Sequence, residues 1–235
     1  MPDLLTTRQL AEYLQLSERS VYRLLERGEI PALKVGGQWR FRKSAVDEWL
    51  DLQVSRMDAA GLDELGGELG HVPVSIAGLL SRENIFLDLP AGSPREVLGA
   101  LVDRLKLPEP VDRELLLARL LEREALCSTA LEDGVAIPHT PRTRERVLHD
   151  HDLVAIGRTA APVEFGALDG QPTSVFVLVL ARDERAHLTL LAKVARMVRE
   201  ADVQAVLRSA ADPDEIVRAV ARAEATLFGG ARGAG

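Results

Sequence analysis

The feature that most constrains the fold is an unbroken apolar run within "SVFVLVLA", at residues 174–181. A strand with one face in water alternates apolar and polar residues, and this run does not alternate. It therefore predicts a strand that is covered on both faces. A membrane-spanning helix needs about 20 apolar residues, so the run is too short to cross a bilayer. We expect a sheet with helices on both faces.

The surrounding sequence from residue 73 alternates between helical and extended patterns. Extended segments are expected at 83–90, near 134–139 and at 151–157, beside the apolar run. Helices are expected at 93–105, 112–125 and 184–200, and a last helix is expected from residue 212. Ser93 with Glu96, and Asp212, stand where helix N-caps are favoured. This half of the chain is predicted to be a mixed-sheet α/β domain.

Residues 54–72 are rich in glycine and show weak periodicity, which is typical of a domain boundary. A loop inside one domain is the alternative, but loops this long are uncommon in compact folds. We expect a first domain at 1–53, a linker at 54–72, a second domain at 73–228 and a flexible tail at 229–235. The class of the whole chain is then α+β.

The first domain shows two short helical patterns, "TTRQLAEYL" and "ERSVYRLLERG", separated by a few residues. Thr6 and Gln9 have capping-box spacing, Ser17 is an expected N-cap, and Gly28 is an expected helix stop. Two helices this close together predict a helix-turn-helix. Next, Gly36-Gly37 predicts a two-residue hairpin, and Ser44 is expected to cap a third helix ending near Trp49.

Charge is concentrated in this domain. The formal net charge of −7 argues against a chain that binds polyanions with its whole surface. Residues 19–43, however, carry seven basic side chains against two acidic ones. On the second helix, Arg19 and Arg23 lie opposite the apolar side, and Ser20 flanks them. A solvated charged face is the alternative to a surface that binds DNA.

Residues 4–50 resemble excisionase-type helix-turn-helix domains, relatives of the MerR-type winged helices. The resemblance rests on "LTTRQLAEYL", "SERSVYRLLERGEIPALKVGG" and "WRFRKSAVDEWL". It implies that the second helix enters the major groove of DNA, where Arg19, Ser20 and Arg23 reach bases. Lys34, Arg40 and Arg42 would hold phosphates from the hairpin. One such helix covers a short site, so we expect two subunits to pair on a repeated operator.

In the second domain, "GVAIPH" places His139 directly after an apolar run and Pro138. Pro138 restricts the backbone and is expected to aim the ring outward. A neutral imidazole has one free lone pair near physiological pH, so it can attack phosphorus without a separate base. Taken alone, a histidine at a strand end is more often a surface residue.

The segments "EREALCSTALEDGVAIPHTP" and "HLTLLAKVA", with "FGALDGQP" between them, resemble enzyme IIA domains of the bacterial phosphoenolpyruvate-dependent phosphotransferase system. The nearest branch is the mannitol/fructose and nitrogen-regulatory type, over about residues 75–227. The resemblance implies that His139 accepts the phosphoryl group, that His187 is its partner in the pocket, and that Arg123 holds the phosphate. It implies the small histidine phosphocarrier protein as donor, and a IIB protein as one acceptor.

Neighbouring residues refine this expectation. Ser128 and Thr129 can add hydroxyl donors to the phosphate, and His187 stands in a first helical turn, where free N–H groups favour an anion. Cys127 and Thr140 stand where the family commonly has glycine, and their larger side chains would restrict approach to the backbone. The alternative to phosphate binding by Arg123 is an ion pair with Glu122 or Glu124.

The remaining signals are weak. A single cysteine excludes an internal disulfide and a cysteine metal cluster. His71, His149 and His151 have no supporting context, and "HDHD" at 149–152 alone rarely makes a metal site. We expect no metal, no cofactor, no membrane insertion and, since no signal peptide is evident, a cytoplasmic location.

Two functions of different class follow. In the first, a DNA-binding regulator is phosphorylated on His139. In the second, a phosphoryl-carrier enzyme passes the group to a IIB partner, and the N-terminal domain is a tether or binds a protein. A weaker third hypothesis is that phosphotransfer has been lost and the second domain only binds partners.

Overall fold

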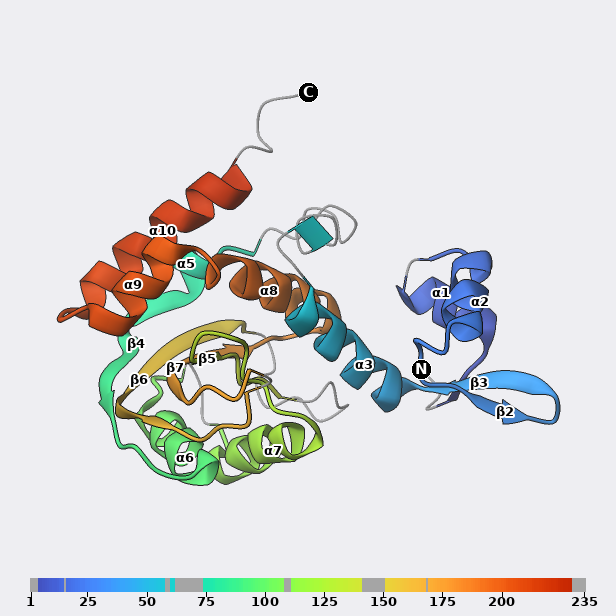
Figure 1. Ribbon diagram of the computed structural model, residues 1–235, viewed down its shortest axis with the longest axis horizontal. Helices are drawn as coiled ribbons and strands as arrows, with labels where there is room; N and C mark the ends of the chain where they lie inside the picture. Colours follow the sequence, from blue (N-terminus) through green and yellow to red (C-terminus); the bar gives the residue numbers. More distant parts are fainter. Residues whose placement is uncertain are drawn as a thin grey trace. The chain divides into compact units, whose positions relative to one another are not determined.

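The computed structural model describes residues 4–14, 16–57, 60–61, 74–107, 111–140, 151–167 and 169–229. They form two compact units (Figure 1). The first holds the residues up to Gln53, and the second holds those from Val54 to Thr140 and the described residues after 150. Most of the predicted linker at 54–72, and the predicted tail from residue 230, lie outside the described residues. The domain boundaries therefore stay predictions.

The first unit opens with the two predicted short helices, α1 (Thr7–Leu14) and α2 (Glu18–Glu26). The capping box before α1 is present, because Thr6 N donates to Gln9 Oε1 at 2.9 Å and Gln9 N donates to Thr6 Oγ1 at 3.3 Å. Ser17 Oγ accepts from Ser20 N at 3.1 Å at the start of α2. Gly28 follows the end of α2 with φ +66°, a left-handed conformation that stops helices and suits glycine. The predicted helix-turn-helix is confirmed.

A three-stranded antiparallel sheet completes this unit, in the order β1 (Leu4–Leu5), β3 (Gln38–Arg42), β2 (Leu33–Val35). Gly36 and Gly37 connect β2 to β3 with φ of +59° and +79°, as a tight two-residue hairpin requires. The sheet packs against the helices through a small core. Its buried members are Leu5, Leu10, Ala11, Val21, Ile30, Phe41 and Val46.

Helix α3 (Lys43–Arg56) differs from the prediction at both ends. It begins at Lys43, so Ser44 lies inside the first turn and is not the cap. Lys43 Nζ pairs with Asp47 at 2.8 Å, an i,i+4 contact that supports a helix starting at this residue. The helix also continues past Trp49, because neither glycine nor proline occurs before Arg56 to terminate it.

The second unit is built on a four-stranded sheet in the order β4-β6-β7-β5. Its strands are β4 (Leu80–Leu89), β5 (Val135–Ala136), β6 (Leu153–Val163) and β7 (Thr173–Leu180). β4 pairs with β6 and β5 pairs with β7 in parallel, whereas β6 and β7 are antiparallel. The sheet is therefore mixed, and the unbroken apolar run is an inner strand, as predicted.

Helices cover both faces of this sheet (Figure 1). On one face lie α6 (Pro94–Arg104) and α7 (Arg113–Leu126). On the other lie α5 (Ile76–Leu79), α8 (Glu184–Met197), α9 (Ala201–Ser209) and α10 (Pro213–Phe228). Successive residues of β7 enter two different cores: Val175, Val177 and Val179 in one, and Phe176, Leu178 and Leu180 in the other. This alternation is why the run needs no polar position.

Helix α9 is an element that the sequence did not predict. The helix expected at 184–200 ends at Met197, and α9 begins at Ala201. Its N-cap residue is Glu200, whose side chain makes no capping hydrogen bond. The local signal that marks the starts of α6, α7 and α10 is therefore missing at this start. Val203 and Leu207 of α9 are buried, so tertiary packing is what stabilises it.

Candidate functional site

The sheet topology brings His139 and His187 to one edge of the second unit. The segment after β5 stays beside β7, since His139 forms a parallel bridge with Val179, and Val179 N donates to Pro138 O at 2.9 Å. Because β5 and β7 are parallel, whatever follows β7 starts at the same edge. Helix α8 follows β7 and carries His187 in its first turn. The two imidazole rings lie 5.3 Å apart between centroids, at 68°.

Arg123 reaches the same place from the last turn of α7. Its Nε donates to His139 Nε2 at 3.0 Å, and its Nη1 donates to the Cys127 carbonyl at 2.9 Å. The side chain is buried, with 2% exposed. The neighbouring carboxylates are engaged elsewhere, because Arg119 holds Glu122 and Thr129 holds Glu124. Arg123 therefore has the place that the resemblance implied, and its suggested pairing with Glu122 or Glu124 is wrong.

Two hydrogen-bonded neighbours of His139 favour one tautomer of its ring. Nδ1 lies 2.8 Å from the carbonyl oxygen of Ile137, which can only accept, so Nδ1 carries the proton. Nε2 faces the Nε–H of Arg123, which can only donate, so Nε2 keeps its lone pair. The neutral ring is thus held in one tautomer. Its nucleophilic nitrogen, Nε2, faces a guanidinium that can receive an anion.

Two expectations about the histidines are wrong. His139 is not aimed outward, since both ring nitrogens are hydrogen-bonded and the side chain is 1% exposed. The first-turn N–H groups of α8 near His187 are also not free. His187 N donates to Asp183 O at 3.0 Å, and Ala186 N donates to Asp183 Oδ1 at 2.8 Å. The amide of His187 is therefore already hydrogen-bonded within its helix, and its ring lies beside that of His139.

In the first unit, α2 presents the predicted cationic face. Arg19 and Arg23 are exposed, and so is Tyr22, which is 46% exposed on the same helix. Ser20 is half-buried, and its Oγ lies 2.9 Å from Ser17 Oγ and accepts from Arg23 Nη2 at 3.2 Å. The structure thus places Ser20 as a support for Arg23 at the start of the helix.

The hairpin divides its three predicted cations between two faces. Arg40 and Arg42 alternate with the buried Phe41 and so lie on the outer face of β3. Lys34 is paired in register with Trp39 and lies on the other face, with its Nζ 5.4 Å from the Trp39 ring centroid. Arg40 is also tethered, because it donates to Gln38 Oε1 and to Trp39 O. Lys34 and Arg42 are exposed.

Comparison with known proteins agrees with both units. Residues 78–223 match the family model described as "Phosphoenolpyruvate-dependent sugar phosphotransferase system, EIIA 2". The chain belongs to this family. Residues 4–51 match a model described as "Helix-turn-helix domain", so the EIIA domain is joined here to a helix-turn-helix domain. Both resemblances that were seen in the sequence are confirmed.

Relatives come from two branches of the family. The nitrogen regulatory protein of Pseudomonas aeruginosa is 30% identical over 151 residues, which is 63% of this chain and 95% of that protein. The fructose-specific EIIABC component of Bacillus subtilis is 26% identical over 61% of this chain and 22% of its own length. Among solved structures, nitrogen regulatory protein IIA-Ntr of Neisseria meningitidis is 29% identical with a TM-score of 0.55, covering 62% of this chain and 98% of its own.

Ser128 and Thr129, the predicted hydroxyl donors of the EIIA site, both have protein acceptors. Ser128 Oγ donates to Phe165 O at 2.5 Å, and Thr129 Oγ1 donates to Glu124 Oε2 at 2.6 Å. Within the described residues, neither hydroxyl is bonded to His139 or His187. Cys127 is easily accommodated in place of glycine, since its φ of −166° is an extended conformation that any residue adopts. Thr140 is half-buried directly after His139.

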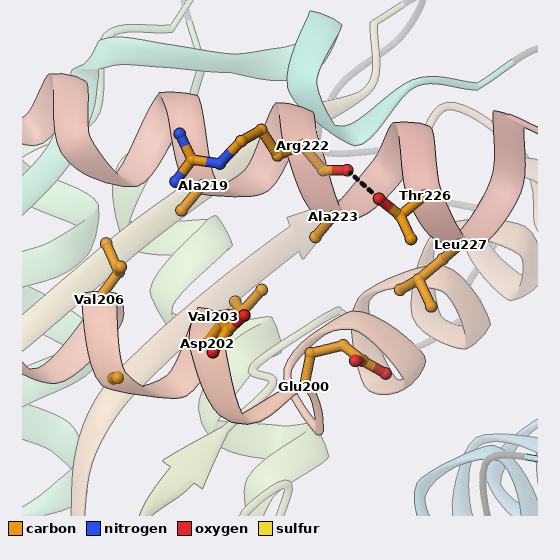
Figure 2. Close-up of a pocket in the computed structure, with 10 residues that line it drawn as sticks. Glu200, Asp202, Val203, Val206, Ala219, Arg222, Ala223, Thr226 and Leu227 are labelled. Carbon is orange, nitrogen blue, oxygen red and sulfur yellow. Dashed lines mark hydrogen bonds between the residues drawn. The ribbon is translucent and has the colours of Figure 1, made fainter.

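Other candidate features lie apart from this cluster. His71 and His149 lie outside the described residues, and His151 is exposed. A cavity of about 560 Å³ lies between α9 and α10, where Thr226 Oγ1 donates to Arg222 O at 3.0 Å (Figure 2). No predicted site residue is among the described residues that line it. Across the described ranges, no helix is both long and apolar enough to cross a membrane.

Two hydrogen-bonding residues near His139 were not predicted in these roles. Ile137 acts through its main-chain oxygen, and a backbone role leaves no mark on side-chain type. Glu124 reaches Thr129, five residues further along the chain and beyond the end of α7. That separation matches neither helical nor strand periodicity. The only local signal was the side chain's position next to Arg123.

Proposed function

We propose that this chain is a cytoplasmic DNA-binding regulator whose EIIA domain is phosphorylated on His139 by the histidine phosphocarrier of the phosphotransferase system. The observation that carries this proposal is the tautomer of His139, whose Nε2 lone pair faces Arg123. The second half of the proposal rests on the exposed cationic face of α2 in the same chain.

The transfer step requires no separate base. The Nε2 lone pair of His139 forms a bond to phosphorus while the bond from phosphorus to the donor's phosphohistidine nitrogen breaks. The electron pair of the broken bond returns to the donor's imidazole, and Nδ1 of His139 keeps its proton on Ile137 O. The incoming group displaces the hydrogen bond from Arg123 Nε to Nε2. The same guanidinium is then available to the phosphoryl oxygens, where charge builds up.

The neighbouring side chains take the remaining roles in this proposal. His187 donates from its ring to a phosphoryl oxygen, consistent with its ring lying beside that of His139. The Ser128 hydroxyl can donate to the phosphoryl group only if it gives up its hydrogen bond to Phe165 O. The Thr129 hydroxyl would likewise have to give up its hydrogen bond to Glu124. We therefore expect Arg123 and His187 to contribute most of the stabilisation of the transferred group.

For DNA, we infer that α2 enters the major groove, with Arg19, Ser20 and Arg23 at base edges. Lys34, Arg40 and Arg42 on the hairpin would contact phosphates. Their division between two faces fits a hairpin that meets the backbone on either side. Two subunits on a repeated operator would give the length of site that one short helix lacks.

Replacing Arg23 by alanine should reduce affinity for the best operator by about 1 to 3 kcal/mol and relax the preference at particular base pairs. Arg42→Ala is the matched control, because this exposed cation lies on the hairpin. It should weaken all sequences alike and reduce the salt slope by about one. Binding curves on an operator and on scrambled DNA, at several salt concentrations, would distinguish the two. Identical profiles for both variants would contradict the assignment of α2 as the reading helix.

The second candidate function is a phosphoryl carrier that passes the group to a IIB protein. It is favoured by the match to the EIIA model and by the fold of Escherichia coli mannitol IIA, whose complex with phosphorylated IIB has been solved. Onward transfer of label from the phosphorylated chain to a IIB acceptor, without any operator binding, would support this function over the first.

The regulatory coupling has its own test. Phosphorylation adds close to two negative charges to the EIIA domain, so we expect operator affinity to differ between the unmodified and phosphorylated protein. Affinity at fixed salt would be compared for both forms and for His139→Ala treated with the same carrier proteins and phosphoenolpyruvate. Equal affinity in all three states would contradict the coupling and leave DNA binding to be judged by Arg23→Ala.

A further inference from the structure

Arg123 and Ile137, which are hydrogen-bonded to the ring of His139, both bond to one short segment, residues 127–129, that follows α7. On the Nε2 side, Arg123 Nη1 donates to the Cys127 carbonyl at 2.9 Å while its Nε reaches the ring. On the Nδ1 side, Ile137 N donates to the Thr129 carbonyl at 3.0 Å, and the Ile137 carbonyl accepts from the ring. A shift of this segment would therefore move both hydrogen bonds that hold the imidazole.

Glu124 fixes this segment. Its two carboxylate oxygens lie 3.0 and 3.2 Å from Thr129 N, and its Oε2 accepts from Thr129 Oγ1 at 2.6 Å. Thr129 is buried, with 2% exposed, so these bonds are made away from water. Hydrogen bonds to an ionised carboxylate are shorter and stronger than neutral ones. The last turn of α7 thus holds the segment through Glu124 and the imidazole through the adjacent Arg123.

We propose that Glu124 is a positioning residue for the phosphoryl acceptor, acting through Thr129 on both ring nitrogens of His139. This proposal rests on the proposed phosphorylation of His139. The hydrogen bonds form a closed circuit that starts at Glu124 and passes through Thr129, Ile137 and His139 to Arg123, the residue next to Glu124 in the helix. Glu124 touches neither the ring nor, by this geometry, the phosphoryl group. It determines which tautomer the ring adopts and where Nε2 points.

The circuit makes a specific claim about the variant Glu124→Ala. Without the carboxylate, the amide and hydroxyl of Thr129 lose their acceptor, and residues 127–129 lose one of the contacts that fix them. The ring should then sample both neutral tautomers, and only one of them presents the Nε2 lone pair. Misplacement of a reacting group by about 1 Å can cost about 100-fold in rate, so we expect single-turnover phosphorylation to slow by about 10- to 100-fold.

The first readout uses the unphosphorylated full-length chain. Long-range proton–nitrogen NMR of the His139 ring should show an Nδ1-protonated tautomer in the wild type and a mixture in Glu124→Ala. Glu122→Ala is the matched control, because Glu122 lies on the same helix, is largely exposed and pairs with Arg119. Its His139 signals should equal those of the wild type. Unchanged ring signals in a folded Glu124→Ala would overturn the proposal.

The second readout is single-turnover phosphorylation at varied concentrations of phosphorylated carrier. The maximal rate should fall in Glu124→Ala while the carrier concentration at half-maximal rate changes little, because Glu124 does not contact the carrier. A change confined to the half-maximal concentration would contradict a positioning role. If wild-type protein accepts no phosphoryl group, the proposed function fails, whereas the ring tautomer still tests Glu124.

A second, smaller change keeps the proposal testable if Glu124→Ala does not fold. Thr129→Val removes only the hydroxyl that donates to Glu124 and leaves the main-chain bond in place. We expect a smaller shift in the same direction, and less than additive effects when it is combined with Glu124→Ala, because both changes break one hydrogen-bonded unit. Wild-type tautomer and rate in Thr129→Val, or strictly additive effects in the double variant, would contradict the circuit.

Discussion

His139→Ala is expected to accept no label when the protein is incubated with labelled phosphoenolpyruvate and the carrier proteins. The loss should be complete, because the variant lacks the Nε2 lone pair that faces the Arg123 guanidinium. Wild-type protein should gain about one phosphoryl group per chain. The product should be acid-labile and base-stable, as an N–P bond to imidazole requires. Gel autoradiography or intact mass would measure it.

The matched control is His151→Ala. His151 is an exposed histidine of the same unit, so its loss tests whether any accessible imidazole can be labelled. It should be phosphorylated at the wild-type rate. Labelling of His139→Ala at the wild-type rate would show that another residue is the acceptor, and the site would have to be reassigned.

The second large effect is expected at Arg123. Arg123→Lys keeps the positive charge but cannot reach His139 Nε2 and the Cys127 carbonyl with one rigid group. Removing one preorganised donor from a site of this kind typically costs about 100- to 1,000-fold in rate. We expect that loss in single-turnover phosphorylation, with the acceptor still His139.

Arg119→Lys provides the comparison on the same helix. Arg119 pairs with Glu122 one turn earlier in α7. It should retain a rate near that of the wild type. If Arg123→Lys were phosphorylated as fast as Arg119→Lys, a positive charge alone would suffice and the geometry at Nε2 would be unimportant.

The sequence predicted those elements whose signals are local. Seven consecutive apolar residues, 175–181, have one explanation at this length, and β7 occupies the inner position that the run implied. Capping residues predicted where helices start, as at Ser93 and Asp212, because a cap is a contact within one turn. Helix α9 lacked such a cap and was missed. The end of α3 was misplaced because neither glycine nor proline terminates the helix near Trp49.

Local sequence signals identified only part of the candidate site. His139 and Pro138 stand out in one stretch, but the distances to Arg123 and His187 depend on the strand order and were implied only by resemblance. The Asp133-Gly134 turn, with φ of +60° and +66°, folds residues 128–131 back on 135–137 and so places Thr129 beside Ile137. Aspartate-glycine is a known hairpin signal, yet the segments beside it are too short to show alternation.

Val179, an inner residue of β7, donates its amide proton to Pro138, directly before His139, the proposed phosphoryl acceptor. The main chain at the proposed acceptor is therefore hydrogen-bonded to an inner strand of the sheet, and such strands open less often than surface loops. Local opening of a surface loop is not expected to move the main chain at His139. Phosphorylation must then be transmitted by side chains that rearrange around a fixed main chain, so the unmodified and phosphorylated states should share one backbone and differ in the shape and charge of the surface around the imidazole.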